Sequence, residues 1–395
     1  MSKTEHNISL FKNTHIAFQD KSNQDLTRAY ILFKTINTPI ISNILIIGLK
    51  LLMHLKMPIK KIIKNTIYKQ FCGGTSINKS KETINKLWKS KIYTILDFSA
   101  ERKESKKDCD KVMEEVISSI IYANKKNNIP FAVFKPSGLA RFSLIEKMNA
   151  KNTKFSHEEQ VERTEFIDRI YKICETAYKN KIPIFIDAEE SWIQNTADNI
   201  ILEMMKKFNK KEAIIFNTLQ MYRTDRLRYL EEIINQSKKD NFYVGIKLVR
   251  GAYLEKEIDR SKRLDYICPV HTKKEDTDRD YNKALSICIK NIKTISLCAG
   301  THNEKSSENL ILLMKKHNIS SNDKRIFFSQ LLGMSDHISY NAAKEGFNVA
   351  KYVPYGPIKD MVPYLIRRAQ ENKSISGQIG RELSNIIQER KRRRL

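Results

Sequence analysis

The sequence lacks the residue patterns that mark several common classes of protein. Its 395 residues include only six cysteines, and no two of them form a Cys-x-x-Cys pair. A chain of this length does not need disulfide bonds, so we expect reduced thiols in a cytoplasmic protein. The metal-binding spacings His-x-His and His-Glu-x-x-His are also absent. We therefore expect no catalytic metal.

Long apolar runs are missing as well. The most apolar stretch, Thr38 to Met57, is interrupted by Lys50, His54 and Lys56, and its longest clean run is Ile44–Leu49. A membrane-spanning helix needs about 20 apolar residues, so we expect no transmembrane span here. The stretch is interpreted as a helix packed on the main domain, with a membrane-surface helix as the alternative. The N-terminus carries no signal-peptide or Arg-rich transit pattern.

Basic residues, in contrast, are abundant. The chain has 71 Lys and Arg against 45 Asp and Glu, a formal net charge of +26. Such a charge is typical of proteins that meet a nucleic acid, an anionic membrane or an acidic ligand. No RNA-binding signature or zinc-finger spacing accompanies it, so we expect no nucleic acid partner and favour peripheral association with an anionic membrane. A basic scaffold that binds RNA or membrane without catalysis is the alternative.

From about residue 90 onward, short apolar, β-branched runs alternate with helical patterns. Strands of this kind, buried on both faces, are typical of parallel sheets. Eight repeats favour a (β/α)8 TIM-like barrel at residues 91–395, preceded by a helical region at residues 1–90. No Gly-x-Gly-x-x-Gly follows the first run, which argues against a dinucleotide-binding open sheet. The eight runs are Ile92–Phe98, Phe131–Phe134, Ile182–Ile186, Ala213–Phe216, Tyr243–Val249, Ile295–Cys298, Arg325–Phe328 and Val349–Val353.

Polar residues gather where these predicted strands end, which is where barrel enzymes place their active sites. Lys135, Asp187 and Lys247 lie at or near three strand ends. Charged groups in such positions are costly unless they are paired. They either form an ion pair that only closes the barrel or create an electrostatic floor for a ligand with separated charges. Gly251 and Ala252 leave room for close approach by a flat ligand.

The stretch Tyr364 to Asn372 follows the last predicted strand and is expected to be helical. Tyr364, Arg367, Arg368 and Glu371 are spaced i, i+3, i+4 and i+7, so they share one helix face. Two adjacent guanidinium groups suit a carboxylate or a phosphate. The alternative is an amphipathic helix with a solvated charged face, but its place after the last strand favours a ligand site.

Taken together, four motifs resemble those of the proline dehydrogenases. They are Lys247 to Tyr253 (KLVRGAY), Asp187 to Glu190 (DAEE), Thr301 to Asn303 (THN) and Tyr364 to Asn372. The resemblance implies a distorted (β/α)8 barrel that binds FAD without a covalent bond. It also implies oxidation of L-proline to Δ1-pyrroline-5-carboxylate, the first step of proline catabolism, with a quinone as electron acceptor. No aldehyde dehydrogenase region follows the barrel in this sequence, so the monofunctional form is expected.

The resemblance also assigns roles to individual residues. The catalytic groups would be Asp187, Lys247 and Lys135. The FAD contacts would be Ala188, Gln220, Val249, Arg250, Gly251, Ala252, Thr301 and His302. The proline-binding groups would be Lys135, Leu332, Tyr352, Tyr364, Arg367, Arg368 and Glu371. Lys247 stands where many bacterial members carry Arg near flavin N5, which leaves the strength of that hydrogen bond open.

Two enzymatic alternatives remain from the sequence. One is a flavin-free barrel lyase or aldolase in which Lys247 or Lys135 forms a Schiff base. The other is a dehydrogenase that prefers hydroxyproline, although Tyr364 favours proline because hydroxyproline-preferring relatives tend to lack this tyrosine. The expected location is cytoplasmic, with peripheral attachment to the inner face of the membrane.

Overall fold

Eight parallel strands form the centre of the molecule. The computed structural model describes residues 10–38, 64–98, 102–150, 152–358, 360–361, 364–365 and 378–395. The strand order is β1-β8-β7-β6-β5-β4-β3-β2, and a parallel bridge between Ile95 and Phe131 joins the two edge strands. The strands are β1 (Tyr93–Phe98), β2 (Ala132–Phe134), β3 (Ile184–Ile186), β4 (Ile215–Gln220), β5 (Val244–Val249), β6 (Ile295–Gly300), β7 (Ile326–Leu331) and β8 (Val349–Tyr355).

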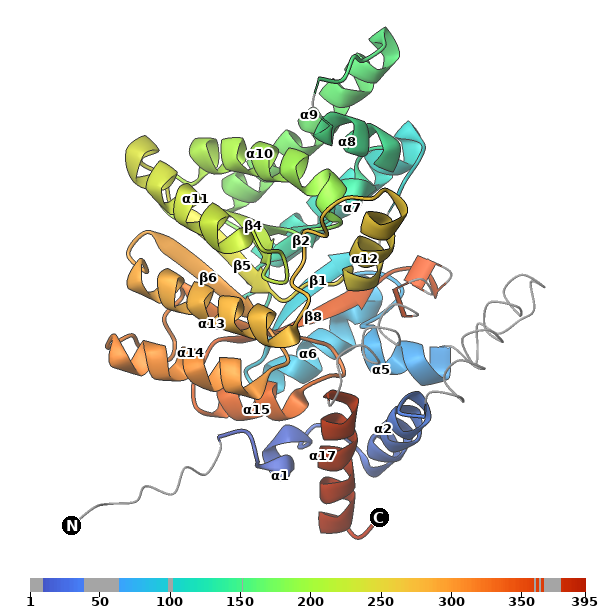
Figure 1. Ribbon diagram of the computed structural model, residues 1–395. Coiled ribbons are helices and arrows are strands. Elements are labelled where there is room, and N and C mark those ends of the chain that lie inside the picture. Colours follow the sequence, from blue (N-terminus) through green and yellow to red (C-terminus); the bar gives the residue numbers. More distant parts are fainter. Residues whose placement is uncertain are drawn as a thin grey trace.

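Helices surround this barrel on its outside (Figure 1). The helices of the barrel ring and its loops are α7 (Lys106–Asn124), α8 (Phe142–Asn149), α9 (His157–Asn180), α10 (Ser191–Phe208), α11 (Arg226–Asp240), α12 (Leu254–Arg263), α13 (Lys274–Lys290), α14 (Glu304–Lys316) and α15 (Asp336–Lys344). Before the barrel lie α1 (Thr14–Ala17), α2 (Asn23–Ile36), α5 (Lys69–Phe71) and α6 (Lys81–Lys89), and after it lies α17 (Gln378–Arg392). The predicted (β/α)8 barrel with a helical N-terminal region is thus confirmed, and each predicted apolar run overlaps one strand, although β4, β6, β7 and β8 extend beyond the predicted ends.

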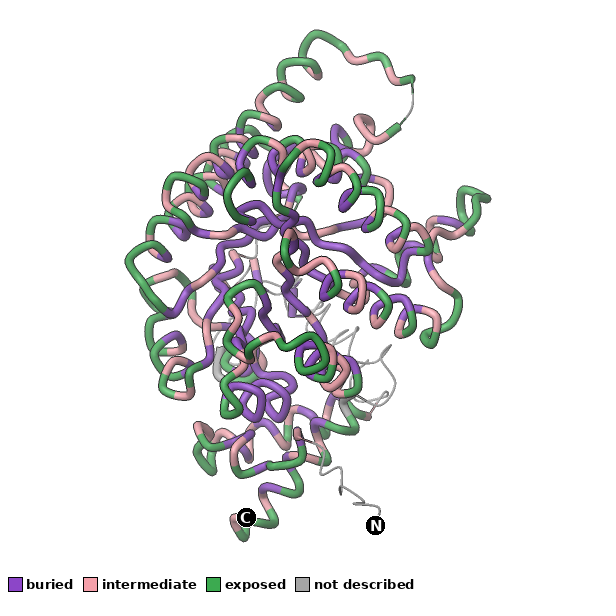
Figure 2. Tube along the Cα trace, turned by 90° about the vertical axis from the view of Figure 1, so that its left-hand side faces the viewer, coloured by how far each residue is buried: buried purple, intermediate pink, exposed green. Residues whose placement is uncertain are grey.

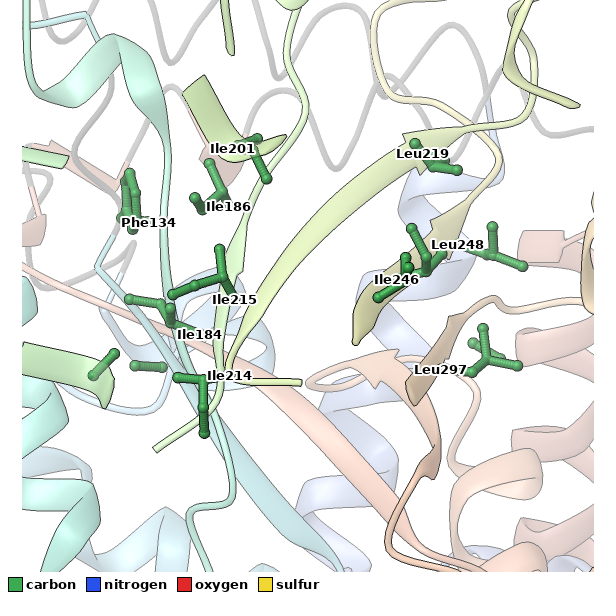
Figure 3. Packing of buried hydrophobic residues seen from close by; sticks show 14 of the residues in the cluster. Phe134, Ile184, Ile186, Ile201, Ile214, Ile215, Leu219, Ile246, Leu248 and Leu297 are labelled. Atoms are coloured by element: carbon green, nitrogen blue, oxygen red, sulfur yellow. The ribbon is translucent and has the colours of Figure 1, made fainter. Parts of the chain in front are cut away.

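The alternation of side chains along each strand creates two separate cores. Outward-facing aliphatic residues two apart, such as Ile184 and Ile186 or Ile246 and Leu248, pack against the surrounding helices (Figure 3). Inward-facing aromatic residues fill the barrel interior, where the rings of Phe131 and Phe185 stack with centroids 4.4 Å apart. Every strand is therefore buried on both faces, which explains its nearly continuous apolar sequence. Figure 2 shows buried strands inside helices whose outer surfaces are exposed.

The two terminal regions pack together beside α15. In Figure 1, α17 lies next to α1 and α2. The Arg393 guanidinium donates hydrogen bonds to the carbonyl oxygens of Phe18 (2.8 Å) and Lys21 (2.7 Å). A second apolar cluster, which includes Phe33 and Ile386, fills this region. The predicted division of the chain near residue 90 stays a prediction.

The N-terminal region also reaches the rim of the barrel. The Gln70 side chain donates to the Gly333 carbonyl at 2.8 Å. Gly333 has φ +77°, and a Cβ there would lie 2.2 Å from the Gln70 carbonyl oxygen, so only glycine fits this contact. Residues 39–57 of the most apolar stretch lie outside the described residues. Among the residues that the structure does describe, no helix has the length and apolarity needed to cross a membrane.

Candidate active site

A cavity of about 320 Å³ opens at the C-terminal ends of the strands. This is the end at which barrel enzymes gather their catalytic groups. Thirteen of the predicted site residues line it: Lys135, Asp187, Ala188, Gln220, Lys247, Val249, Arg250, Gly251, Ala252, Thr301, His302, Tyr352 and Tyr364. The sequence patterns that seemed separate along the chain therefore meet in one place.

A carboxylate between two lysines forms the floor of the cavity. Asp187 follows β3 and accepts a hydrogen bond from the Lys247 ammonium, which extends inward from β5. The Lys135 ammonium lies 3.6 Å from the other oxygen of Asp187 and 3.2 Å from an oxygen of Asp97. The Tyr352 hydroxyl accepts from Lys247 at 2.6 Å and donates to Asp187 at 3.2 Å. Two cations, two carboxylates and a phenol thus form one connected network.

The charges of this network determine its protonation. Burial alone raises the pKa of the Asp187 carboxyl, but the charges of Lys247 and Lys135 lower it, and the net pKa is below its usual value. Burial raises the pKa of Tyr352 well above its usual value, and the nearby carboxylates Asp187 and Asp97 raise it further. At neutral pH the carboxylate is therefore ionised and the phenol keeps its proton.

Gln220 connects two loops of the rim. Its side-chain NH₂ donates to the Glu189 carbonyl at 2.7 Å, and its oxygen accepts from the Ala252 backbone N–H at 3.1 Å. Gly251 has φ +139°, and a Cβ there would lie 2.5 Å from the Tyr222 ring. The backbone of residues 251–252 is therefore held at the cavity wall by Gln220 and can follow this path only with glycine at position 251.

Arg250 is fixed by groups from three elements. Its guanidinium donates to Asp278 of α13 (2.6 Å), to Thr301 after β6 (2.5 Å) and to Ser306 of α14 (2.9 Å). The guanidinium also lies 4.4 Å from the centroid of the Tyr281 ring. These contacts hold a permanent positive charge at the cavity wall with little freedom to rotate.

Four predicted site residues are not among the described residues that line the cavity. Leu332 is not among the cavity-lining residues; its neighbour Leu331 is, while Leu332 packs against the outer apolar core. Leu331 is the last residue of β7, so the inward direction falls one residue earlier than predicted. Arg367, Arg368 and Glu371 lie outside the described residues, and their proposed clamp stays a prediction.

Sequence reasoning did not assign a site role to ten other residues of the lining. They are Asp97, Thr218, Tyr253, Lys274, Gly300, Asn303, Ser329, Gln330, Leu331 and Arg381. Asp97 had a detectable signal, because it is an acidic residue inside an apolar strand and lies two residues after inward-facing Ile95. Lys274 and Arg381 had none, since each is one of many basic residues on a helix and reaches the cavity only through the fold.

Comparison with known proteins agrees with this geometry. A family model described as proline dehydrogenase matches residues 80–381. The carbapenem antibiotics biosynthesis protein CarD of Pectobacterium carotovorum subsp. carotovorum is 33% identical over 331 residues, which cover 84% of each chain. Proline dehydrogenase 1, mitochondrial, of Dictyostelium discoideum is 31% identical over 434 residues, covering 98% of this chain and 76% of that protein.

Solved structures show the same fold. Proline utilization A from Bdellovibrio bacteriovorus, inactivated by N-propargylglycine, superposes with a TM-score of 0.72 at 19% identity. The match covers 96% of this chain and 42% of that much longer one. The family model covers most of the chain, and the residues that carry the resemblance line one cavity. The chain therefore belongs to the proline dehydrogenase family, whose members are oxidoreductases.

Proposed function

We propose that this protein oxidises L-proline to Δ1-pyrroline-5-carboxylate with FAD bound in the barrel cavity. The observation that carries the proposal is the buried Lys135–Asp187–Lys247 network beneath a cavity of about 320 Å³, in a chain of this family. A small zwitterion needs fixed charges of both signs close together, and this network provides them. The product would enter proline catabolism toward glutamate.

The residues present fit a flavin. The backbone at Gly251 and Ala252 presents no long side chain to the cavity, which suits a flat ring. The hydroxyl of Thr218 lines the cavity, is buried and has no hydrogen-bond partner within the described part of the chain. A polar group of a bound ligand could supply the missing hydrogen bond. Arg250 and Lys274 add positive charge that suits a diphosphate.

The groups proposed to hold FAD are those that the resemblance assigned. They are Ala188, Gln220, Val249, Arg250, Gly251, Ala252, Thr301 and His302, all of which line the cavity. When bound there, the flavin would accept the hydride from proline C5. The Lys247 ammonium, kept in place by Asp187 and Tyr352, would favour additional negative charge beside it.

The protein's part in the reaction is to orient proline and to control protons. Lys135 and Asp187 are proposed to face the substrate amine, whose proton must leave as C5 is oxidised. Tyr352 and Tyr364 line the cavity and would pack against the pyrrolidine ring. Arg367 and Arg368 are proposed to bind the carboxylate, and each charge-assisted hydrogen bond would contribute about 1.5–3 kcal/mol.

The proposed electron acceptor is a membrane quinone, with the protein attached from the cytoplasmic side. The loop after α12 exposes Leu264 (52%), Tyr266 (39%) and Ile267 (94%). The residues at the two ends of this segment, Tyr253 before α12 and Lys274 at the start of α13, line the cavity. An exposed apolar loop that lies in the sequence between two cavity-lining residues, in a protein of net charge +26, supports contact with an anionic membrane.

The absorbance spectrum of the purified protein tests the proposal most directly. We expect an oxidised-flavin spectrum that L-proline bleaches and D-proline does not. Comparing the rates with L-proline and hydroxyproline distinguishes the two dehydrogenase alternatives. A colourless protein that borohydride traps covalently with a carbonyl substrate would instead identify a Schiff-base lyase.

A further inference from the structure

The C-terminal helix α17 places Arg381 in the cavity lining and also reaches the cavity-lining His302 through Ser335. His302 follows β6 and lines the cavity, and its Nδ1 lies 2.9 Å from the Ser335 hydroxyl. Ser335 is fully buried in the turn before α15. Its backbone N–H (2.5 Å) and its hydroxyl (3.1 Å) both lie within hydrogen-bond distance of one carboxyl oxygen of Glu382, on α17. We propose that Glu382 is a positioning residue that determines, through Ser335, which ring nitrogen of His302 carries the proton.

The number of hydrogens on Ser335 carries the argument. A serine hydroxyl has one proton to donate, and a carboxyl oxygen that receives two donors can only accept. The Ser335 hydroxyl oxygen lies 3.1 Å from this acceptor oxygen, and two oxygens this close repel each other unless a proton lies between them. The Ser335 proton therefore points to Glu382, and the hydroxyl offers only lone pairs to His302. It follows that Nδ1 of His302 is the donor of the 2.9 Å bond. In the neutral ring, Nε2 then has no proton and acts as an acceptor.

This conclusion does not depend on the charge of Glu382. Burial raises the pKa of this carboxyl, and Asp336 raises it too, while His337, the Ser335 N–H and Lys351 lower it. A protonated carboxyl still presents one oxygen that accepts hydrogen bonds, and the Ser335 backbone N–H 2.5 Å from Oε1 favours the proton on the other oxygen. Ser335 therefore keeps the same orientation in either state. For the same reason, a glutamine at position 382 can replace the acceptor.

The helix that carries Glu382 is fixed at both ends. Near its start, Arg381 lines the cavity and lies 3.7 Å from the Glu304 carboxylate. At its end, Arg393 is bonded to the carbonyl of Phe18. Glu382 is 3% exposed, so its side chain is held by the packing of α17 and is not free to move into solvent. The terminal helix thus acts on the cavity through His302, and any effect on flavin binding rests on the proposed function.

Nitrogen NMR of histidine-labelled full-length protein tests the inference without relying on activity. We expect His302 to be the Nδ1–H tautomer in the wild type and in Glu382→Gln. In Glu382→Ala the Ser335 hydroxyl is free to turn toward Nδ1, so the Nε2–H tautomer should become populated. Ser335→Ala should change the His302 signals in the same way, and it provides a second route if Glu382→Ala does not fold.

Glu389→Ala is the matched control, because Glu389 is equally buried on the same helix but binds Arg392 and Arg393 instead. It should leave the His302 tautomer unchanged even if it destabilises α17. An Nε2–H tautomer in the wild type, or equal changes in Glu382→Ala and Glu389→Ala, would overturn the inference. If no flavin binds while the tautomers behave as expected, the proposed function fails and the positioning role stands.

Discussion

At the scale of single residues, Asp187 balances the charge of the cavity floor. Lys247 is 4% exposed and has no other carboxylate partner among the described residues, whereas Lys135 also pairs with Asp97. An unpaired ammonium in this setting would lose much of its solvation without compensation. The carboxylate of Asp187 is thus needed both to keep the barrel stable and to keep Lys247 directed at the cavity.

We expect Asp187→Asn to lower the free energy of unfolding by about 3 kcal/mol, because it leaves a buried lysine uncompensated. We also expect kcat to fall by at least about 100-fold, since Lys247 loses its carboxylate partner and keeps only the Tyr352 hydroxyl. Urea unfolding and steady-state kinetics with proline measure the two effects. Asp323→Asn is the control, because Asp323 pairs with Arg325 before β7, away from the cavity lining. Full activity in Asp187→Asn would show that the network only closes the barrel.

Replacing glycine by alanine is expected to change the stability of the protein in opposite directions at two positions. Gly251→Ala should destabilise the protein by about 1–3 kcal/mol and weaken flavin binding, because φ is +139° and the Tyr222 ring would be only 2.5 Å from the new Cβ. Gly380→Ala, within α17, meets nothing within 4 Å and should stabilise the protein by up to about 1 kcal/mol. Thermal unfolding checks both. A stable, fully flavinated Gly251→Ala would contradict the close-approach argument.

At the scale of elements, the strands could be predicted from sequence and the site only in part. β8 is buried at every position, and such strands read as continuous apolar runs. The sequence did not determine which of two neighbouring side chains at a strand end points into the barrel, since Leu331 lines the cavity where Leu332 was predicted. The contribution of α17 was not predicted, because nothing in the sequence around Glu382 indicates that it meets a serine 47 positions earlier.

A buried ion pair between β8 and α15 gives a prediction at this scale. Lys351 is fully buried, and its ammonium lies 2.8 Å from Asp336, which also pairs with Lys21 at 3.2 Å. Asp336→Asn should destabilise the protein by about 3–5 kcal/mol, since it leaves the buried Lys351 without its carboxylate partner. The double variant Asp336→Asn with Lys351→Met should recover much of this loss, and urea unfolding at pH 7 measures both. Equal stability of the single and double variants would show that the pair is not coupled.

The same pair predicts how stability depends on pH. Burial raises the pKa of Asp336, but Lys351 and Lys21 lower it, to about 2 in the folded protein. The pKa of Asp336 is lower in the folded protein than in the unfolded chain. Its ionised carboxylate therefore contributes fully to the free energy of unfolding above about pH 4, and this contribution is lost as the pH falls toward 2. The difference between the folded and unfolded pKa values of Asp336 corresponds to about 2 kcal/mol of stability. Unfolding between pH 5 and pH 2 should therefore show a smaller loss of stability in the Asp336→Asn, Lys351→Met double variant than in the wild type.

At the scale of the whole molecule, the net charge of +26 was evident from the sequence, but the face that would meet a membrane was not. Charge is spread along the chain, and exposure of apolar side chains is decided by the fold. Ile267 is 94% exposed, although it follows an amphipathic helix and lies close to well-buried Val270. Exposure in the fold is thus the reason for proposing the loop after α12 as the surface that would contact a membrane.

Vesicle flotation tests this surface. Inserting an isoleucine side chain into the interface would contribute about 1.5–3 kcal/mol, so Ile267→Glu should weaken binding to anionic vesicles by at least about tenfold. Leu312→Glu is the matched control, because Leu312 is 63% exposed on α14, outside this loop and the cavity lining. Binding should also decrease as salt is raised, since surface charges are screened. Equal binding to neutral vesicles, or equal losses in both variants, would remove the loop after α12 from the membrane contact.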